Sequence, residues 1–215
     1  CTYCVIPFLK GCLRSRRLED ILCEAEHLVQ CGAKEIIIVA QDTTAYGKDI
    51  YNGKKLALLL QELEKIDRLK WIRILYCYPD EIDDELLEEI ARNPKVCKYF
   101  DIPVQHISDK ILKKMGRRGS SNDIESLIEK IRNRMPEAVI RTSIMVGFPG
   151  EEDDDFSLLT SFIKKTGFDN LGVFIYSEEE GTPAANFKNN VTKKIKRERY
   201  KKIMLMQKEI AEAKS

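Results

Sequence analysis

The first four residues, Cys1-Thr2-Tyr3-Cys4, carry two thiols in a CxxC pair. Such a pair can be half of a zinc site, a dithiol redox motif or part of an iron–sulfur ligand set. Zinc is disfavoured because there is no second CxxC, and His27 and His106 lie far apart in the sequence. A dithiol redox motif is disfavoured because a long basic loop over residues 10–17 follows the pair. The spacing alone excludes none of the three.

Polar and glycine-containing segments recur at one place in the pattern, directly after each strand-like stretch. These segments are residues 41–44, 76–80, 105–106, 147–151 and 177–183. In parallel α/β folds, functional residues collect at the carboxyl ends of the strands, which is where these segments fall. We therefore expect the five segments to gather on one functional rim.

The elements that must position this rim are predicted from hydrophobic periodicity. Continuous apolar runs predict strands at 36–40, 71–75, 99–104, 139–146 and 171–176. Helical spacing predicts helices at 18–30, 56–63, 82–90, 109–115, 123–135 and 156–165, and a charged amphipathic helix from about residue 192. This alternation predicts an α/β fold with a parallel sheet, either doubly wound or a full or partial (β/α) barrel. We expect one domain followed by a helix that packs Tyr200, Ile203 and Met204 against it.

The composition of the chain argues against some classes of protein. The 215 residues include 36 Lys and Arg and 35 Asp and Glu, and this balance argues against a globally basic nucleic-acid binder. No apolar run approaches the roughly 20 residues that span a bilayer, so we expect no membrane contact. The seven cysteines are odd in number and follow no signal peptide, which predicts a reduced, cytoplasmic protein.

Several segments resemble one family. Residues 1–11, with Arg14-Ser15-Arg16 after them, closely resemble the cluster loop of radical S-adenosylmethionine methylthiotransferases. That family's motif is CxxxCxxC, in which Cys1 and Cys4 match the second and third cysteines, and the first is expected four residues upstream of Cys1. Segments 39–47, 102–109 and 176–184 resemble the branch that modifies a ribosomal protein, whereas 141–151 is common to both branches.

The resemblance implies a fold and cofactors. The expected fold is a partial (β/α)6 TIM-like barrel of the radical SAM type, with its first strand upstream of residue 1. We expect the core domain at 1–190 and a helix at 191–215 that leads to a TRAM domain outside this sequence. The implied cofactors are S-adenosylmethionine and a 4Fe-4S cluster on Cys1, Cys4 and the upstream cysteine. A second 4Fe-4S cluster is expected on an N-terminal domain outside this sequence.

The resemblance also implies a reaction. A deoxyadenosyl radical would abstract hydrogen from the β-carbon of an aspartate in small-subunit ribosomal protein S twelve, and sulfur and a methyl group would then be inserted. The expected partners are that protein, an electron donor and RNA through the TRAM domain. The piece alone is expected to be inactive. The alternatives are the same chemistry on isopentenyl-adenosine in tRNA, and a non-catalytic metal-binding α/β module.

The resemblance assigns individual residues, and most have a structural alternative. The residues assigned to the cofactor are Tyr3, Gln41, Asp42, Thr43, Arg141, Ser143, Gly147 and Tyr176. Those assigned to the substrate are Arg14, Arg16, Gln105 and His106, and no catalytic side chain is assigned. In the alternatives, Tyr3 packs under its loop, Asp42 caps an Asx-type turn, and His106 is a hydrogen-bonded structural residue. Arg141 and Ser143 would then pair within a buried sheet, and the two arginines would belong to a solvated basic loop.

Overall fold

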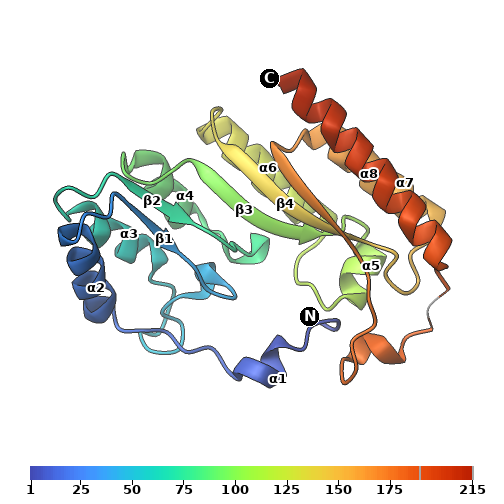
Figure 1. The fold of residues 1–215 in the computed structure, drawn as a ribbon, viewed down its shortest axis with the longest axis horizontal. Helices are drawn as coiled ribbons and strands as arrows, with labels where there is room; N and C mark the ends of the chain where they lie inside the picture. Colours follow the sequence, from blue (N-terminus) through green and yellow to red (C-terminus); the bar gives the residue numbers. More distant parts are fainter. Residues whose placement is uncertain (189, 215) are drawn as a thin grey trace. The chain divides into compact units, whose positions relative to one another are not determined.

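The computed structural model describes residues 1–188 and 190–214, and the chain packs into two compact units. Unit 1 combines the segments 1–12, 103–128 and 139 onward. Unit 2 combines the segments 13–102 and 129–138. Figure 1 shows the elements of both units along the chain.

Unit 2 is built on two parallel strands, β1 (Glu35–Ile38) and β2 (Trp71–Ile74), with Ile36 opposite Ile72. Its helices are α2 (Leu18–Gln30), α3 (Leu56–Glu64) and α4 (Asp84–Arg92), and two 3-10 turns follow the strands, η1 (Thr43–Ala45) and η2 (Pro79–Glu81). Helix α3 packs against α2 and α4. It buries a row of leucines at helical spacing, which explains why this segment is a helix: Leu56, Leu59, Leu60 and Leu63.

Unit 1 is built on the sheet β3-β4-β5, in which β4 (Val139–Val146) and β5 (Asn170–Ile175) are parallel. Strand β3 (Tyr99–Gln105) begins in the residues of unit 2 and ends in those of unit 1. Its helices are α1 (Ile6–Lys10), α5 (Asp109–Lys114), α7 (Asp153–Thr166) and α8 (Lys193–Lys214), with a 3-10 turn η3 (Pro183–Asn186). Helix α6 (Ser121–Arg134) begins in the residues of unit 1 and ends in those of unit 2. Helix α8 packs against β4, β5 and α7, and Figure 1 shows it running beside them.

Capping residues explain where two helices begin. Helix α7 begins three residues before the expected start at Phe156, because Glu152 and Asp155 form a reciprocal capping box. Helix α4 begins after the expected start at Ile82, because the side chain of Asp83 accepts the N–H of Leu86. The apolar periodicity marked the buried face correctly, whereas the helix starts follow from polar side chains.

The α/β class and the parallel pairing are confirmed, but the described strands pair into two sheets rather than one. After β2, the ladder continues only through one isolated bridge between Ile72 and Val96. The backbone then turns, because the N–H of Tyr99 bonds to the carbonyl of Cys97 at 2.7 Å. This turn diverts the N–H that a continuous ladder would use.

The buried face of α8 differs from the expected one. Ile203 is buried as predicted, but Met204 is 39% exposed, so its predicted packing is wrong. The buried positions are 196, 199, 203, 206 and 207, and they include two basic side chains, Lys196 and Arg199. In the described residues, no helix is long and apolar enough to cross a membrane.

Candidate cofactor site

The CxxC loop is fixed by the residue between its thiols. The N–H of Thr2 donates to the carbonyl of Met115 at 2.8 Å, and its hydroxyl donates to the carbonyl of Lys114 at 2.8 Å. The carbonyl of Thr2 accepts the N–H of Ala184 at 2.9 Å. One residue therefore ties the loop to the end of α5 and to η3.

Neither thiol of this loop is in a disulfide, and Cys1 is exposed and Cys4 half-buried. The guanidinium of Arg117 lies 3.9 Å from the sulfur of Cys1. Among the described residues, no three His, Cys, Asp or Glu side chains are arranged to hold a metal ion. Two soft thiolate ligands on a fixed loop fit part of an iron–sulfur ligand set, and the third ligand would have to come from outside this sequence.

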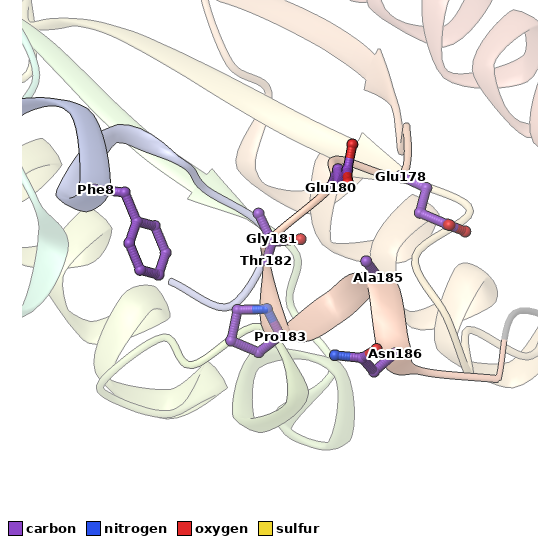
Figure 2. A pocket seen from close by; sticks show the side chains of 8 residues that line it. All are labelled: Phe8, Glu178, Glu180, Gly181, Thr182, Pro183, Ala185 and Asn186. Atoms are coloured by element: carbon purple, nitrogen blue, oxygen red, sulfur yellow. The ribbon is translucent and has the colours of Figure 1, made fainter.

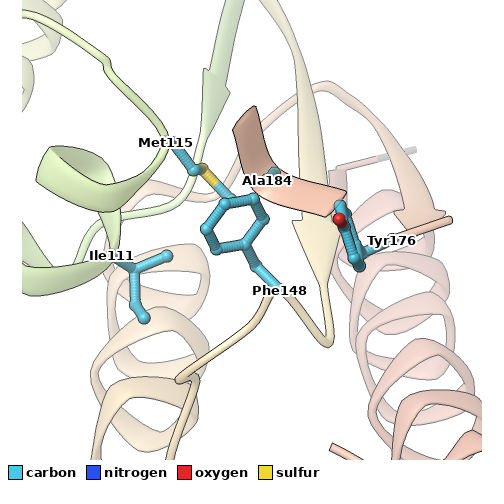
Figure 3. Close-up of a cluster of buried hydrophobic side chains, with 5 residues drawn as sticks. All are labelled: Ile111, Met115, Phe148, Tyr176 and Ala184. Carbon is cyan, nitrogen blue, oxygen red and sulfur yellow. The ribbon is translucent and has the colours of Figure 1, made fainter. Parts of the chain in front are cut away.

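Aromatic rings surround the loop within unit 1. Phe148 is fully buried in a cluster with Ile111, Met115, Tyr176 and Ala184 (Figure 3). Its ring meets those of Tyr3 and Tyr176 edge-on, with centroids 6.1 Å and 5.1 Å apart. The structure thus brings Tyr3, Tyr176 and the turn that begins at Gly147 together, as expected for one rim.

Four buried side-chain polar atoms in unit 1 have no hydrogen-bond partner among the described residues. One is Oε1 of Gln207 on α8, and the other three lie at or just after strand ends: Oε1 of Gln105, Nε2 of His106 and the hydroxyl of Tyr176. Gln105 has φ +70°, a strained conformation for a side chain of this kind, and its amide donates to the Ser143 hydroxyl at 3.2 Å. Buried polar groups are normally paired, so unpaired ones at a strand end indicate a ligand. Gln105 and Tyr176 therefore fit the polar part of a nucleoside.

The turn after β4 is held by a long-range ion pair. The carboxylate of Glu151 accepts the N–H groups of Gly147 and Phe148 at 2.7 Å and 3.4 Å. On its other side it pairs with the guanidinium of Arg199, which also reaches Asp153 at 2.7 Å. Burial raises the pKa of Glu151, and the Arg199 charge and the two N–H groups oppose this shift. The turn is therefore fixed by a charge that comes from α8.

A second residue of α8 closes the same turn. Lys196 is 8% exposed, its ammonium donates to the carbonyl of Tyr176 at 3.2 Å, and it lies 4.8 Å from the centroid of that ring. Gly147 has φ +74°, and a Cβ there would clash with the Lys196 side chain. Burial lowers the pKa of Lys196. Glycine is needed at 147 for its backbone conformation and for this close approach.

His106 is fully buried beside this turn. Its Nδ1 accepts the N–H of Ser108 at 3.0 Å, so Nε2 carries the proton in the neutral ring, 3.8 Å from the Glu151 carboxylate. Burial lowers the pKa of His106 to about 4, so the ring is neutral near pH 7. This geometry matches the structural alternative, and contact of His106 with a substrate stays a prediction.

In unit 2, Asp42 begins η1 after β1. Its Oδ1 accepts the N–H groups of Thr44 and Ala45 at 3.1 Å and 3.3 Å, and the Thr44 hydroxyl as well. Burial raises the pKa of Asp42, with the Glu81 charge adding to the shift. The Asx-type cap is therefore present. A cofactor contact of Asp42 would use its other carboxylate oxygen.

The side chains on either side of Asp42, Gln41 and Thr43, differ in whether they are accessible to a ligand. Thr43 is 1% exposed, its N–H donates to the carbonyl of Tyr76 at 3.1 Å, and its hydroxyl donates to that of Leu75. Gln41 is exposed. The side chain of Thr43 therefore holds the turn to the end of β2, and that of Gln41 is accessible to a ligand.

The structure also places the remaining assigned residues, whose roles stay predictions like those of the others. Arg14 is exposed, and Arg16 pairs with Glu24 on the surface of unit 2. Arg141 is only the third residue of β4, which puts it about 16 Å of strand before Val146. Ser143 lies closer to the carboxyl end and touches Gln105.

Sequence reasoning missed the basic residues of α8. Lys196 and Arg199 share one face of α8. Lys196 lies against Gly147 and bonds to the carbonyl of Tyr176, and Arg199 pairs with Glu151. Two basic residues three apart in a strongly charged helix give no signal that distinguishes them from solvated neighbours. Glu151 is the first of five consecutive acidic residues, 151–155, and nothing in the sequence marks it as a buried carboxylate that needs a distant cation.

Comparisons with known proteins agree with this geometry. The family model of the radical SAM superfamily matches residues 1–163. A ribosomal protein uS12 methylthiotransferase RimO from Acetivibrio thermocellus is 54% identical over 215 residues, all of this chain and 48% of that protein. The one from Geobacter sulfurreducens is 53% identical over 207 residues, 96% of this chain and 46% of that protein. The chain thus spans about half the length of these relatives.

Solved structures share the fold at low identity. Coproporphyrinogen III oxidase HemN from Escherichia coli, a radical SAM enzyme, superposes with a TM-score of 0.69 at 16% identity, covering 98% of this chain and 50% of that one. The radical S-adenosylmethionine methyltransferase TsrM from Kitasatospora setae gives 0.67 at 21% identity, covering 86% and 36%. These likenesses confirm the expected radical SAM type of α/β fold.

Proposed function

Because the chain belongs to the radical SAM superfamily, for which a 4Fe-4S cluster and S-adenosylmethionine are the implied cofactors, we propose that it is the catalytic core of a ribosomal protein methylthiotransferase. The whole protein would insert sulfur and a methyl group at the β-carbon of an aspartate in uS12. The observation that carries this proposal is the placement of two cysteines outside any disulfide, Cys1 and Cys4, on a loop fixed at Thr2. The tRNA alternative is not favoured, because the relatives reported above are named as uS12 enzymes.

The residues of this chain would hold the cofactors. Cys1 and Cys4 would ligate the cluster together with a cysteine from upstream. Bound there, the cluster and S-adenosylmethionine would supply the radical chemistry that removes hydrogen from carbon. The protein's part is to position the reacting groups and exclude water.

Within unit 1, the side chains at the strand ends would bind the nucleoside. The unpaired Oε1 of Gln105 can accept a hydrogen bond, and the hydroxyl of Tyr176 can donate one. The ring of Tyr3 offers an apolar wall beside Phe148. The turn at Gly147 allows the backbone to approach a ligand closely because it has no Cβ.

In unit 2, Gln41 and the second carboxylate oxygen of Asp42 would bind the methionine amino group. Arg14, Arg16 and Arg141 would attract carboxylates of cofactor or substrate. The whole protein would work in the cytoplasm with an electron donor, and would carry a second 4Fe-4S cluster on an N-terminal domain and a TRAM domain that contacts RNA.

The test uses the full-length protein, reconstituted anaerobically with iron and sulfide. Dithionite, S-adenosylmethionine and uS12 are added, and deoxyadenosine and methylthiolated uS12 are quantified by mass spectrometry. We expect both products, and we expect both to disappear in Cys4→Ala. The matched control is Cys12→Ala, because Cys12 is an exposed thiol outside the motif.

Two results would overturn the proposal. An intact cluster that yields deoxyadenosine without modified uS12 would reject the substrate. Equal cluster content in Cys4→Ala and Cys12→Ala would reject the assignment of the ligands.

A further inference from the structure

A cavity of about 810 Å³ opens in unit 1 beside the CxxC loop. Its walls come from two segments, α1 with Phe8 on one side, and residues 178–186 between β5 and the end of η3 on the other (Figure 2). Phe8 lies four residues after Cys4 in the sequence. The opposite wall is joined to the CxxC loop by the hydrogen bond from Ala184 to Thr2. Whatever binds in this cavity therefore lies next to the proposed cluster loop.

The walls present an aromatic ring and two carboxylates. Phe8 is 74% exposed on a helix that buries none of its residues, so packing within the chain does not explain an aromatic side chain there. Glu178 and Glu180 also line the cavity, are exposed, and form no ion pair within the described residues. The Phe8 ring can stack against a planar cation, and the carboxylates can accept its N–H groups.

This combination selects one kind of side chain. A guanidinium is planar, stacks on aromatic faces and offers its N–H groups in a fork that matches carboxylates. An ammonium is compact and strongly hydrated, and it gains less from the ring. Proteins that bind ribosomal RNA are rich in arginine and lysine because they neutralise phosphates, so a ribosomal protein substrate would supply such side chains.

We propose that this cavity binds an arginine side chain of the protein substrate and thereby holds the neighbouring aspartate at the cluster loop. The proposal rests on the proposed function, and it adds the site by which a protein substrate is recognised. Because Glu178 and Glu180 alternate along the chain with Glu179, the cavity uses only two of three consecutive glutamates.

That alternation provides a matched control. In the full-length enzyme, Glu178→Gln combined with Glu180→Gln removes both negative charges from the cavity and keeps side-chain size. Glu179→Gln removes a charge from the same exposed segment, but Glu179 does not line the cavity. With uS12 as substrate, we expect the double variant to raise KM about 10-fold or more and Glu179→Gln to change it less than about 2-fold. We also expect the increase of KM with salt to be shallower in the double variant.

The aromatic wall is tested in the same way. Phe8→Ala should raise the KM for uS12 about 5-fold or more, whereas Leu9→Ala, at an equally exposed neighbour outside the cavity, should not. On the substrate side, each arginine near the modified aspartate of uS12 is changed to lysine or glutamine. One of these variants should lose most of its sensitivity to the Glu178 and Glu180 substitutions, as expected of a coupled pair.

The outcomes separate this inference from the proposed function. If the unaltered enzyme forms deoxyadenosine but does not modify uS12, the proposed function fails before the cavity is tested. If it modifies uS12 and the double variant behaves like Glu179→Gln, the cavity inference is wrong and the function stands. Melting temperatures and iron content of all variants are compared, so that a rise in KM is not confused with misfolding.

Discussion

Two turns of this molecule each follow a parallel strand, and each is held by one carboxylate that accepts two backbone N–H groups. In unit 2, Asp42 stands at the start of its turn and caps Thr44 and Ala45. In unit 1, Glu151 stands at the end of its turn and reaches back to Gly147 and Phe148. Burial raises the pKa of both carboxyl groups.

The two turns differ in what balances the charge. The carboxylate of Asp42 is stabilised locally, by hydrogen bonds from the N–H groups of Thr44 and Ala45 and from the Thr44 hydroxyl. Glu151 is fully buried and depends on Arg199, 48 residues away. The comparison teaches that a partly solvated carboxylate can be satisfied within its own turn, whereas a buried one requires a cation from a distant element.

The largest effect is expected from removing that cation. Arg199→Met would leave the Glu151 carboxylate buried without its partner, at a cost of about 3–5 kcal/mol of stability. The melting temperature of the full-length enzyme should fall strongly, and the amides of residues 147–151 should lose protection from hydrogen exchange. Arg197→Met, on the exposed side of α8, is the control, and an equal fall there would contradict the role of Arg199.

The next effect concerns the close approach to the turn in unit 1. Gly147→Ala puts a Cβ at φ +74° and against Lys196, so we expect a loss of about 1–2 kcal/mol from the backbone and 1–3 kcal/mol from overpacking. Adding Lys196→Ala should recover the second part only. Thermal unfolding of the single and double variants measures both parts, and strictly additive losses would rule out the steric contact.

A pH-dependent effect distinguishes the two histidines. The pKa of His106 is lowered to about 4 from an ordinary value near 6.5, so the unfolded chain binds a proton that the folded chain excludes. Its contribution to stability is complete above about pH 6.5 and is lost as the pH falls towards 4, by about 3 kcal/mol.

Melting temperatures between pH 4 and 7 test this sign. His106→Asn keeps an acceptor for the N–H of Ser108 and should flatten the dependence relative to the unaltered protein. Because Glu151 and Asp155 titrate in both proteins, the difference between the two curves isolates the histidine. His27→Asn, at an exposed histidine, is the matched substitution control, and an unchanged slope in His106→Asn would disprove the assignment.

The smallest effect is expected at the local turn. Asp42→Ala removes one capping side chain from a 3-10 turn, at a cost of about 1 kcal/mol. Asp42→Asn keeps the acceptor oxygen and should retain most of that stability. If Asp42→Ala costs as much as Arg199→Met in the same melting experiment, the distinction between a local and a long-range turn fails.

The same distinction explains what the sequence could predict. The strand at 139–146 and the helix at 18–30 were predicted to the residue, because their apolar periodicity is local. The Asx-type cap at Asp42 was also readable, since donor and acceptor are two or three positions apart. The resemblance to a known family supplied the ligand assignment for Cys1 and Cys4, which the spacing of the thiols left open.

What could not be predicted depends on residues brought together by folding. The ion pair between Glu151 and Arg199, and the contact of Lys196 with Gly147, join α8 to a turn that the sequence separates from it. The break between β2 and β3 depends on a backbone turn at Cys97 and Tyr99, for which no glycine or proline gives a signal. The strained φ of Gln105 is likewise a property of its surroundings.

The dependence of Glu151 on Arg199 also affects the order in which this region folds during synthesis. A ribosome adds about 5–20 residues per second, so Arg199 is synthesised roughly 2–10 seconds after the carboxylate it neutralises. During that interval the Glu151 carboxylate has no cation to pair with, so it cannot be buried and must remain hydrated. The turn that we assign to the proposed nucleoside site is therefore completed only when α8 emerges, so that site would not take up its ligand before synthesis of this region is finished.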